Sequence, residues 1–151
     1  WKMPQAQPAA GALAFQYPTL FNKGHVYASL MITDSYKIRP IEYGPGYTTF
    51  DSIGTAPLNQ WSQVVYTWNT AGSSIYINGA FDNSSSSVTW DDINFTTAWV
   101  GQIAQIARNI QVSPETDNFD GLISIVRGYD RVLTSGEVLT NYDALKGRFG
   151  L

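Results

Sequence analysis

The strongest constraint on the fold is one alternating run near the middle of the chain, WSQVVYTWNTAGSSIYINGAF. In its first half, Val64, Tyr66 and Trp68 alternate with Val65 and Thr67. This two-residue period is that of a β-strand with two different faces. The letters TAGS interrupt the alternation, and SIYI then resumes it. The run therefore predicts two antiparallel strands joined by a tight turn.

A second tight turn is expected at Asn78-Gly79, because both residue types adopt the positive φ angles of a type I′ turn. The chain should return there as a further strand. Nine Tyr, seven Phe, five Trp and thirteen Gly also favour short strands joined by turns. Other strand-like runs are ALAFQ, HVYASLMIT, the two halves of YKIRPIEYGPGYTTFDSI, NFTTAWVGQ and FDGLISIVRGYDRVL.

Three stretches depart from this pattern. The opening WKMPQAQPAAG has no period, so residues 1–11 are predicted to form an arm or linker before one domain at residues 12–151. The polar run NSSSS is predicted to be a loop. In IAQIARNIQV the apolar residues have helical spacing, which favours either a short helix or an irregular insertion packed on the predicted strands.

The C-terminal stretch YDRVLTSGEVLTNYDALKGRFGL predicts one helix of about three turns. Thr134 and Glu137 have the spacing of a capping box, in which each side chain satisfies a backbone N–H of the other residue. Gly147 is suited to end the helix in a left-handed conformation. Phe149 and Leu151 are expected to anchor the tail on the body or on a neighbour. The predicted buried stripe consists of Val138, Leu139, Tyr142 and Leu145.

Composition excludes several classes of protein. The formal net charge is −3 and the nine Lys and Arg form no basic stripe, which argues against nucleic-acid binding. The chain has no cysteine, so disulfides, thiolate chemistry and zinc sites with sulfur ligands are excluded. Its single histidine, His25, excludes a two-histidine metal site within one chain. No run approaches the ~20 apolar residues of a membrane span, so no membrane insertion is expected.

Three segments together resemble the concanavalin A-like lectin/glucanase superfamily, particularly its laminin-G-like members. These are LNQWSQVVYTWNTAGSSIYINGA, AWVGQ and FDGLISIVRGYDRVLTSGEV, within Leu58 to about Tyr142. The resemblance implies an all-β fold, a jelly-roll β-sandwich of two antiparallel sheets, here with one short C-terminal helix. The family often has acidic residues where this chain has Ser124 and Ile125, which weakens any ligand or ion site carried over from it.

Sugar binding needs an exposed aromatic ring with amide or carboxylate partners beside it. Tyr43 and Tyr47 flank the breaker GPG, and Trp90 precedes Asp91 in VTWDDINF. These four loop residues are the candidates for contact with a glycan or a protein partner. The tryptophans on predicted strands are expected in the core instead: Trp61, Trp68 and Trp99.

The carboxylates do not predict catalysis. A retaining glucanase holds two carboxyl groups about 5–5.5 Å apart. In ETDNFD, Glu115 and Asp117 would share a strand face, but Asp120 falls out of phase and Gly121 follows at once. The chain is therefore predicted not to be an enzyme, and no catalytic or metal residue is assigned. Calcium stays an alternative for two loops, with ligands from Asp91 and Asp92, or from Asp117, Asn118 and Asp120.

Two functions follow. The first is a non-enzymatic structural module of a virus particle, as a capsid decoration or fibre domain, because the tail NYDALKGRFGL resembles endings of laminin-G-like modules in bacteriophage virion proteins. Its partners would be other virion proteins or copies of itself, with host glycans as further contacts. The alternative is a carbohydrate-binding domain of a secreted bacterial enzyme or adhesin. Either function places the chain on a virion surface or outside the cell.

Overall fold

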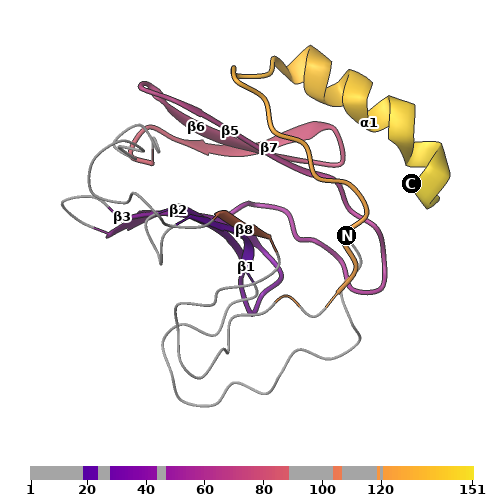
Figure 1. Cartoon of the computed structure of the whole chain (residues 1–151), viewed down its shortest axis with the longest axis horizontal. Helices are drawn as coiled ribbons and strands as arrows, with labels where there is room; N and C mark the ends of the chain where they lie inside the picture. Colours follow the sequence, from indigo (N-terminus) through magenta and orange to yellow (C-terminus); the bar gives the residue numbers. More distant parts are fainter. Residues whose placement is uncertain (1–18, 24–27, 44–46, 89–103, 107–118, 120) are drawn as a thin grey trace.

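The computed structural model describes the chain except for residues 1–18, 24–27, 44–46, 89–103, 107–118 and 120. The described part consists of short strands followed by one helix (Figure 1). In chain order these are β1 (Thr19–Lys23), β2 (Ala28–Ile32), β3 (Ile38–Tyr43), β4 (Tyr47–Thr49), β5 (Val64–Asn69), β6 (Gly72–Ile77), β7 (Ala80–Ser85), β8 (Ala104–Ile106) and α1 (Ser135–Phe149).

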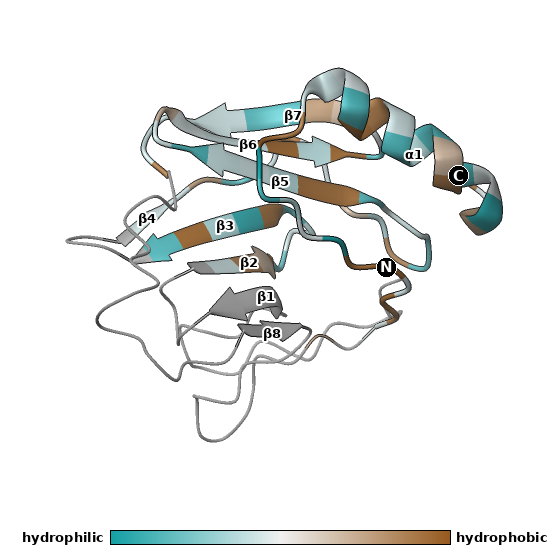
Figure 2. Ribbon diagram, turned by 45° about the horizontal axis from the view of Figure 1, so that its top comes forward, coloured by the Kyte–Doolittle hydropathy of each residue, from teal (hydrophilic) through white to brown (hydrophobic). Residues whose placement is uncertain are grey.

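The strands form two antiparallel sheets that face each other. One sheet has the order β4-β3-β2-β1-β8, and the other has the order β5-β6-β7. Helix α1 lies on the outer side of the three-stranded sheet, away from the five-stranded sheet (Figures 1 and 2). This arrangement confirms the predicted all-β sandwich of two antiparallel sheets with one C-terminal helix.

The β5–β6 hairpin has the predicted alternation. Its ladder runs from Val64 opposite Ile77 to Asn69 opposite Gly72. Inward-facing residues of both strands pack into the core between the sheets, whereas outward-facing ones pack beneath α1. The buried residues of the inner core are Ile32, Ile38, Ala56, Ile75 and Phe119, with Val64, Tyr66 and Ile77 packed against them. The outer cluster consists of Tyr76, Leu133 and Val138, with Val65 packed against it.

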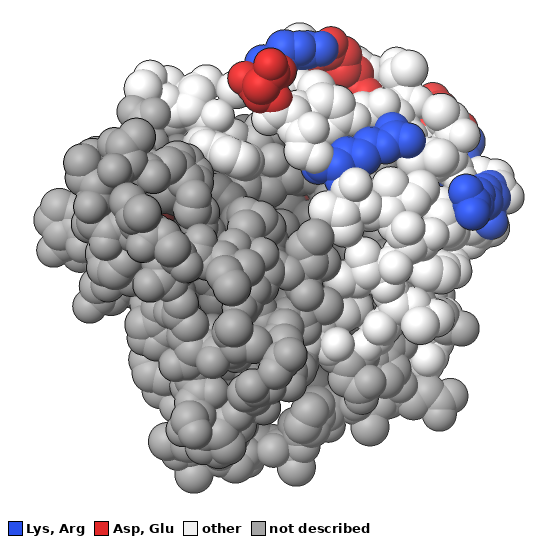
Figure 3. Space-filling model, in the orientation of Figure 1, with Lys and Arg blue, Asp and Glu red and all other residues white. Residues whose placement is uncertain are grey.

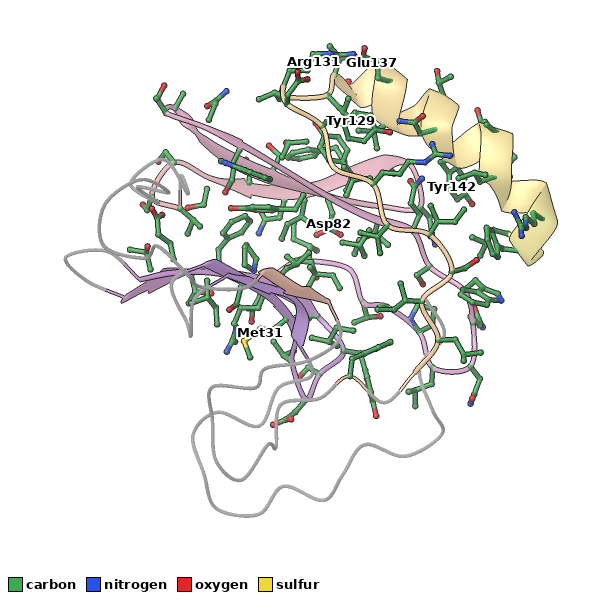
Figure 4. The ribbon with its side chains drawn as sticks, viewed as in Figure 1. Met31, Asp82, Tyr129, Arg131, Glu137 and Tyr142 are labelled. Carbon is green, nitrogen blue, oxygen red and sulfur yellow. The ribbon has the colours of Figure 1, made fainter. Side chains whose placement is uncertain are left out.

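The predicted Asn78-Gly79 turn joins β6 to β7. Asn78 has a φ of 50° and Gly79 a φ of 80°, as a type I′ turn requires. Gly79 also lies directly beneath α1, because a Cβ atom at this position would be 2.8 Å from the Tyr142 ring. Figure 4 shows Tyr142 pointing from the helix toward the sheet. A residue with any side chain would therefore push the helix away from the turn.

A polar clamp connects the two sheets through the loop after β4. Asp82 of β7 accepts hydrogen bonds from the backbone N–H groups of Ile53 (2.6 Å) and Gly54 (2.8 Å). Lys37, next to β3, donates to the carbonyl oxygens of Ser52 (3.0 Å) and Ile53 (3.2 Å). The loop is thus held by a carboxylate from one sheet and an ammonium group from the other.

The start of α1 is the predicted capping box. Thr134 Oγ1 accepts a hydrogen bond from the Glu137 N–H (3.3 Å), and the Glu137 carboxylate accepts one from the Thr134 N–H (2.9 Å). Arg131 forms an ion pair with Glu137 at 2.6 Å, visible at the top of Figure 4. Hydrogen bonds from Arg131 and Thr134 lower the pKa of Glu137 to about 2.

The end of α1 differs from the prediction. The helix continues through Gly147 to Phe149, and Gly150 takes the left-handed conformation at a φ of 68°. The expected anchoring of the tail on the body is confirmed for Phe149, because the Phe149 and Trp61 rings lie 5.0 Å apart between centroids. The predicted stripe is only partly buried: Val138 is buried, Tyr142 and Leu145 are half-buried and Leu139 is exposed.

The predicted strand in FDGLISIVRGYDRVL was wrong, since residues 121–133 form no strand. Phe119 belongs to the core between the sheets, whereas Leu133 packs in the outer cluster beneath α1. The segment therefore passes from one side of the three-stranded sheet to the other and leaves Leu122 and Val126 exposed. An alternating sequence forms a strand only where a neighbouring strand accepts its hydrogen bonds.

Two local predictions were also wrong. Ala104–Ile106 is strand β8, which pairs with β1, so this part of IAQIARNIQV is not helical. Strand β7 extends to Ser85, so the first part of NSSSS is strand rather than loop. The predicted arm at residues 1–11 and the runs ALAFQ and NFTTAWVGQ lie outside the described residues.

Replacing Gly79 tests the contact between the turn and the helix. We expect Gly79→Ala to lower the free energy of unfolding by about 1–3 kcal/mol, because the new Cβ strains a positive-φ turn and overlaps Tyr142. Urea unfolding followed by circular dichroism measures the change. The matched control is Gly136→Ala, since nothing lies within 4 Å of a Cβ there. Equal unfolding midpoints for the two variants would contradict this account.

The Arg39–Asp51 pair predicts a pH dependence. Arg39 Nε and Nη2 donate to the Asp51 carboxylate at 2.6 and 2.8 Å. The hydrogen bonds from Arg39 are the main cause that lowers the pKa of Asp51 below its ordinary value of 3.8. The stabilisation is therefore complete above pH 3.8 and is lost as the pH falls through the lowered folded-state pKa.

The measurement is the difference in free energy of unfolding between the wild type and Asp51→Asn across this pH range. We expect the wild type to be the more stable protein at pH 6 and the difference to shrink as the pH falls from 4 to 2. A difference that stays constant over this range would show that the ion pair does not titrate as described.

Candidate functional site

One end of the sandwich combines residues from both sheets. Strand β3 ends there at Tyr43, and strand β5 ends there at Asn69, as both views show (Figures 1 and 2). We call this region the Trp68 end and define it by Glu42, Tyr43, Tyr47, Tyr66 and Trp68, together with the polar residues opposite Trp68 in the β5–β6–β7 ladder.

Trp68 is the exposed aromatic residue of this end. Its side chain is 39% exposed, and its ring stacks on Tyr66 with centroids 5.6 Å apart and an interplanar angle of 19°. Because residues two apart on a strand share a face, Trp68 extends the inner face of the sheet to its rim. The prediction of a core position for Trp68 was therefore wrong, although its assigned strand and face were right.

Two serines follow Trp68 in the same row of the sheet. Trp68 is opposite Ser73 in β6, and Ser73 is opposite Ser85 in β7. Ser73 is buried, whereas Ser85 is half-buried. The turn beyond them is tight: Asn69 Oδ1 accepts a hydrogen bond from the Ala71 N–H at 2.8 Å. An aromatic surface with uncharged polar groups beside it is the chemistry that recognises a sugar, whose C–H face is apolar and whose rim carries hydroxyls.

The layer behind Trp68 is polar and buried. Burial raises the pKa of the Tyr66 phenol, the neighbouring Ser73 hydroxyl acts in the opposite direction, and the charge of Glu42 raises the pKa further. Glu42 belongs to β3 and is 6% exposed. Tyr66 of one sheet and Glu42 of the other therefore interact across the space between the sheets.

Two of the four predicted contact residues lie at this end. Tyr43 and Tyr47 are opposite each other in the β3–β4 ladder, directly after Glu42. The structure thus brings their backbones to the same end of the sandwich as Trp68. The other two predicted residues, Trp90 and Asp91, lie outside the described residues.

The carboxylates considered for catalysis or calcium also lie outside the described residues, as does His25. In the part of the chain that the structure describes, no group of three or more His, Cys, Asp or Glu is placed to hold a metal ion. That part also contains no helix long and apolar enough to cross a membrane. The carboxylates concerned are Asp91, Asp92, Glu115, Asp117 and Asp120.

Sequence reasoning missed Trp68, although one signal was present. The residue directly precedes the Asn69–Gly72 turn, so it occupies the last pairs of its strand. Side chains at the end of a sheet have neighbours on one side only, and a large ring there stays partly uncovered. Position along the strand, rather than hydrophobicity, was the useful indicator.

Comparison with solved structures supports the fold. A protein from Bacteroides ovatus ATCC 8483, described as a "putative carbohydrate binding protein", matches with a TM-score of 0.63 and 19% identity. The match covers 82% of this chain but only 36% of that protein, so this chain spans about a third of its length. At this identity the likeness shows the fold alone.

A second solved structure is an S-layer domain-containing protein (residues 221–444) from Clostridium thermocellum ATCC 27405. It matches with 18% identity and a TM-score of 0.46, over 94% of this chain and 70% of that one. No curated protein matches the sequence.

A laminin-G family model, described as "Concanavalin A-like lectin/glucanases superfamily", matches residues 1–139. This match covers most of the chain, and the two-sheet sandwich described above agrees with it. The chain therefore belongs to the concanavalin A-like lectin/glucanases superfamily.

Proposed function

We propose that this chain is a non-catalytic carbohydrate-binding module and that Trp68 is its stacking platform. The observation that carries the proposal is the partly exposed Trp68 ring, supported from behind by Tyr66. Contact with Tyr66 reduces the freedom of the indole before binding, so less conformational entropy is lost when a ligand binds to it. Ser85, which is half-buried, places a hydroxyl group in the same row of the sheet.

Binding without bond cleavage fits the carboxylates of the described strands. Glu42 is buried behind Tyr66. Asp51 is paired with Arg39, and Asp82 holds backbone N–H groups of the loop after β4. A retaining glycosidase requires two carboxyl groups about 5–5.5 Å apart on either side of the scissile bond. These three carboxylates have separate structural roles and provide no such pair.

The lectin-like fold supports binding to glycans outside a cell or on a surface. The description of the Bacteroides protein as carbohydrate-binding supports the same function. A virus particle remains the second candidate setting. Its support is the resemblance of the tail NYDALKGRFGL to phage virion modules and the anchoring of that tail through Phe149. The two settings are compatible, since a glycan-binding module can be carried on a particle.

The test is glycan binding by Trp68→Ala. We expect this variant to bind at least about tenfold more weakly than the wild type, which corresponds to ~1.4 kcal/mol, because the stacking surface is removed. Trp68→Phe should retain part of the affinity. Affinity gel electrophoresis against a panel of polysaccharides gives the dissociation constants.

Phe81→Ala is the matched control. Phe81 is 57% exposed on the same sheet, but it packs against Tyr76 on the opposite face. We expect its affinity to equal that of the wild type. Equal weakening by both substitutions, or no weakening by Trp68→Ala in a folded protein, would contradict the proposed site.

A further inference from the structure

We infer that the Trp68 end selects neutral glycans and rejects anionic ones; the inference rests on the proposed function. The first observation is a long gap in the basic residues of the chain. Residues 40–107 contain no Lys, Arg or His. Their acidic residues are Glu42, Asp51, Asp82, Asp91 and Asp92.

This acidic stretch builds most of the proposed site. It supplies strands β4 to β7, both tyrosines of the β3–β4 pair and the Trp68 ring. Sulfate, carboxylate and phosphate groups are bound in proteins mainly by charge-assisted hydrogen bonds from Arg and Lys. The stretch offers an anionic sugar no such partner.

The described basic side chains that precede this stretch are engaged elsewhere. Arg108, which follows it, lies outside the described residues. Lys37 precedes β3 and is bonded to the Ser52 and Ile53 carbonyls. The six residues of β3 separate it from the Trp68 end by roughly 20 Å. Arg39 is paired with Asp51.

The other basic residues that form ion pairs in the described part of the chain lie in α1 or just before it. Arg131 pairs with Glu137, and Lys146 with Asp143. Figure 3 shows both acidic and basic side chains on the side of the molecule where the helix lies, and the helix covers the outer face of the three-stranded sheet. Trp68 belongs to the inner face, so their charges lie on the other side of the sheet.

In the described strands, the backbone of one basic residue reaches this end of the five-stranded sheet. Lys23 of β1 is opposite Ala28 of β2, which is opposite Glu42 of β3. The row places Lys23 two strands, or roughly 10 Å, from Glu42. Of the two, Glu42 is the charge that acts on Tyr66, the support of Trp68.

Uncharged polar groups are available instead. Asn69 and Thr70 lie exposed in the turn after Trp68. Ser86 is exposed after Ser85, and its Cα would lie 3.0 Å from a Cβ at Gly72, so it is adjacent to the same turn. These groups both donate and accept hydrogen bonds, as the hydroxyls of a neutral sugar require.

The experiment compares neutral polysaccharides with their charged counterparts. Dextran is paired with dextran sulfate, and hydroxyethyl cellulose with carboxymethyl cellulose, at pH 8, where an ordinary histidine is neutral. In affinity gel electrophoresis, we expect at least one neutral polymer to slow the migration of the chain. Binding to its anionic counterpart should be about tenfold weaker or absent. Neutral binding should be unchanged between low and high salt, since no ion pair contributes.

Ser86→Lys sharpens the test. We expect this variant to gain binding to the anionic polymer in a salt-sensitive manner. Equal or tighter binding of the anionic polymer by the wild-type chain would overturn this inference and leave the proposed function standing. If none of the neutral or anionic polymers is bound, the proposed function itself is overturned.

Discussion

The register between β5 and β6 determines both faces of the three-stranded sheet. Because Tyr66 is opposite Ile75, these residues point together into the core between the sheets, and Val65 and Tyr76 point together toward α1. A slip of one residue would exchange the two sets and bury neither correctly. The same register also carries Trp68 to the rim of the inner face, so the proposed site depends on the pairing that forms the core.

Polar bonds join the two sheets away from the Trp68 ring. Asp82 of β7 and Lys37, which precedes β3, hold the loop after β4 from opposite sheets. Toward the end of β5, the Tyr66–Trp68 stack leaves an aromatic surface open to solvent. A surface that is packed in place before binding loses little entropy when a ligand binds to it.

Local features were predictable from the sequence, whereas coverage by distant residues was not. The β5–β6 alternation, the Asn78-Gly79 turn and the Thr134–Glu137 capping box depend on residues a few positions apart, and all three are confirmed. Residues 121–133 alternate equally well but form no strand, because strand formation requires a partner that alternation cannot show. The exposure of Trp68 was missed for the same reason: it depends on which segments pass over the end of the strand.

The central claim is that the glycan contacts Trp68, and indole N–H resonances test it most directly. The chain has five tryptophans, so single Trp→Phe variants can assign each signal in a two-dimensional NMR spectrum. Oligosaccharides cut from the neutral polysaccharide that retards the chain are then titrated in. We expect a saturable shift of the Trp68 indole N–H resonance. The resonance of Trp61, which packs against Phe149, should not move. A saturable shift at other indoles without one at Trp68 would contradict the claim.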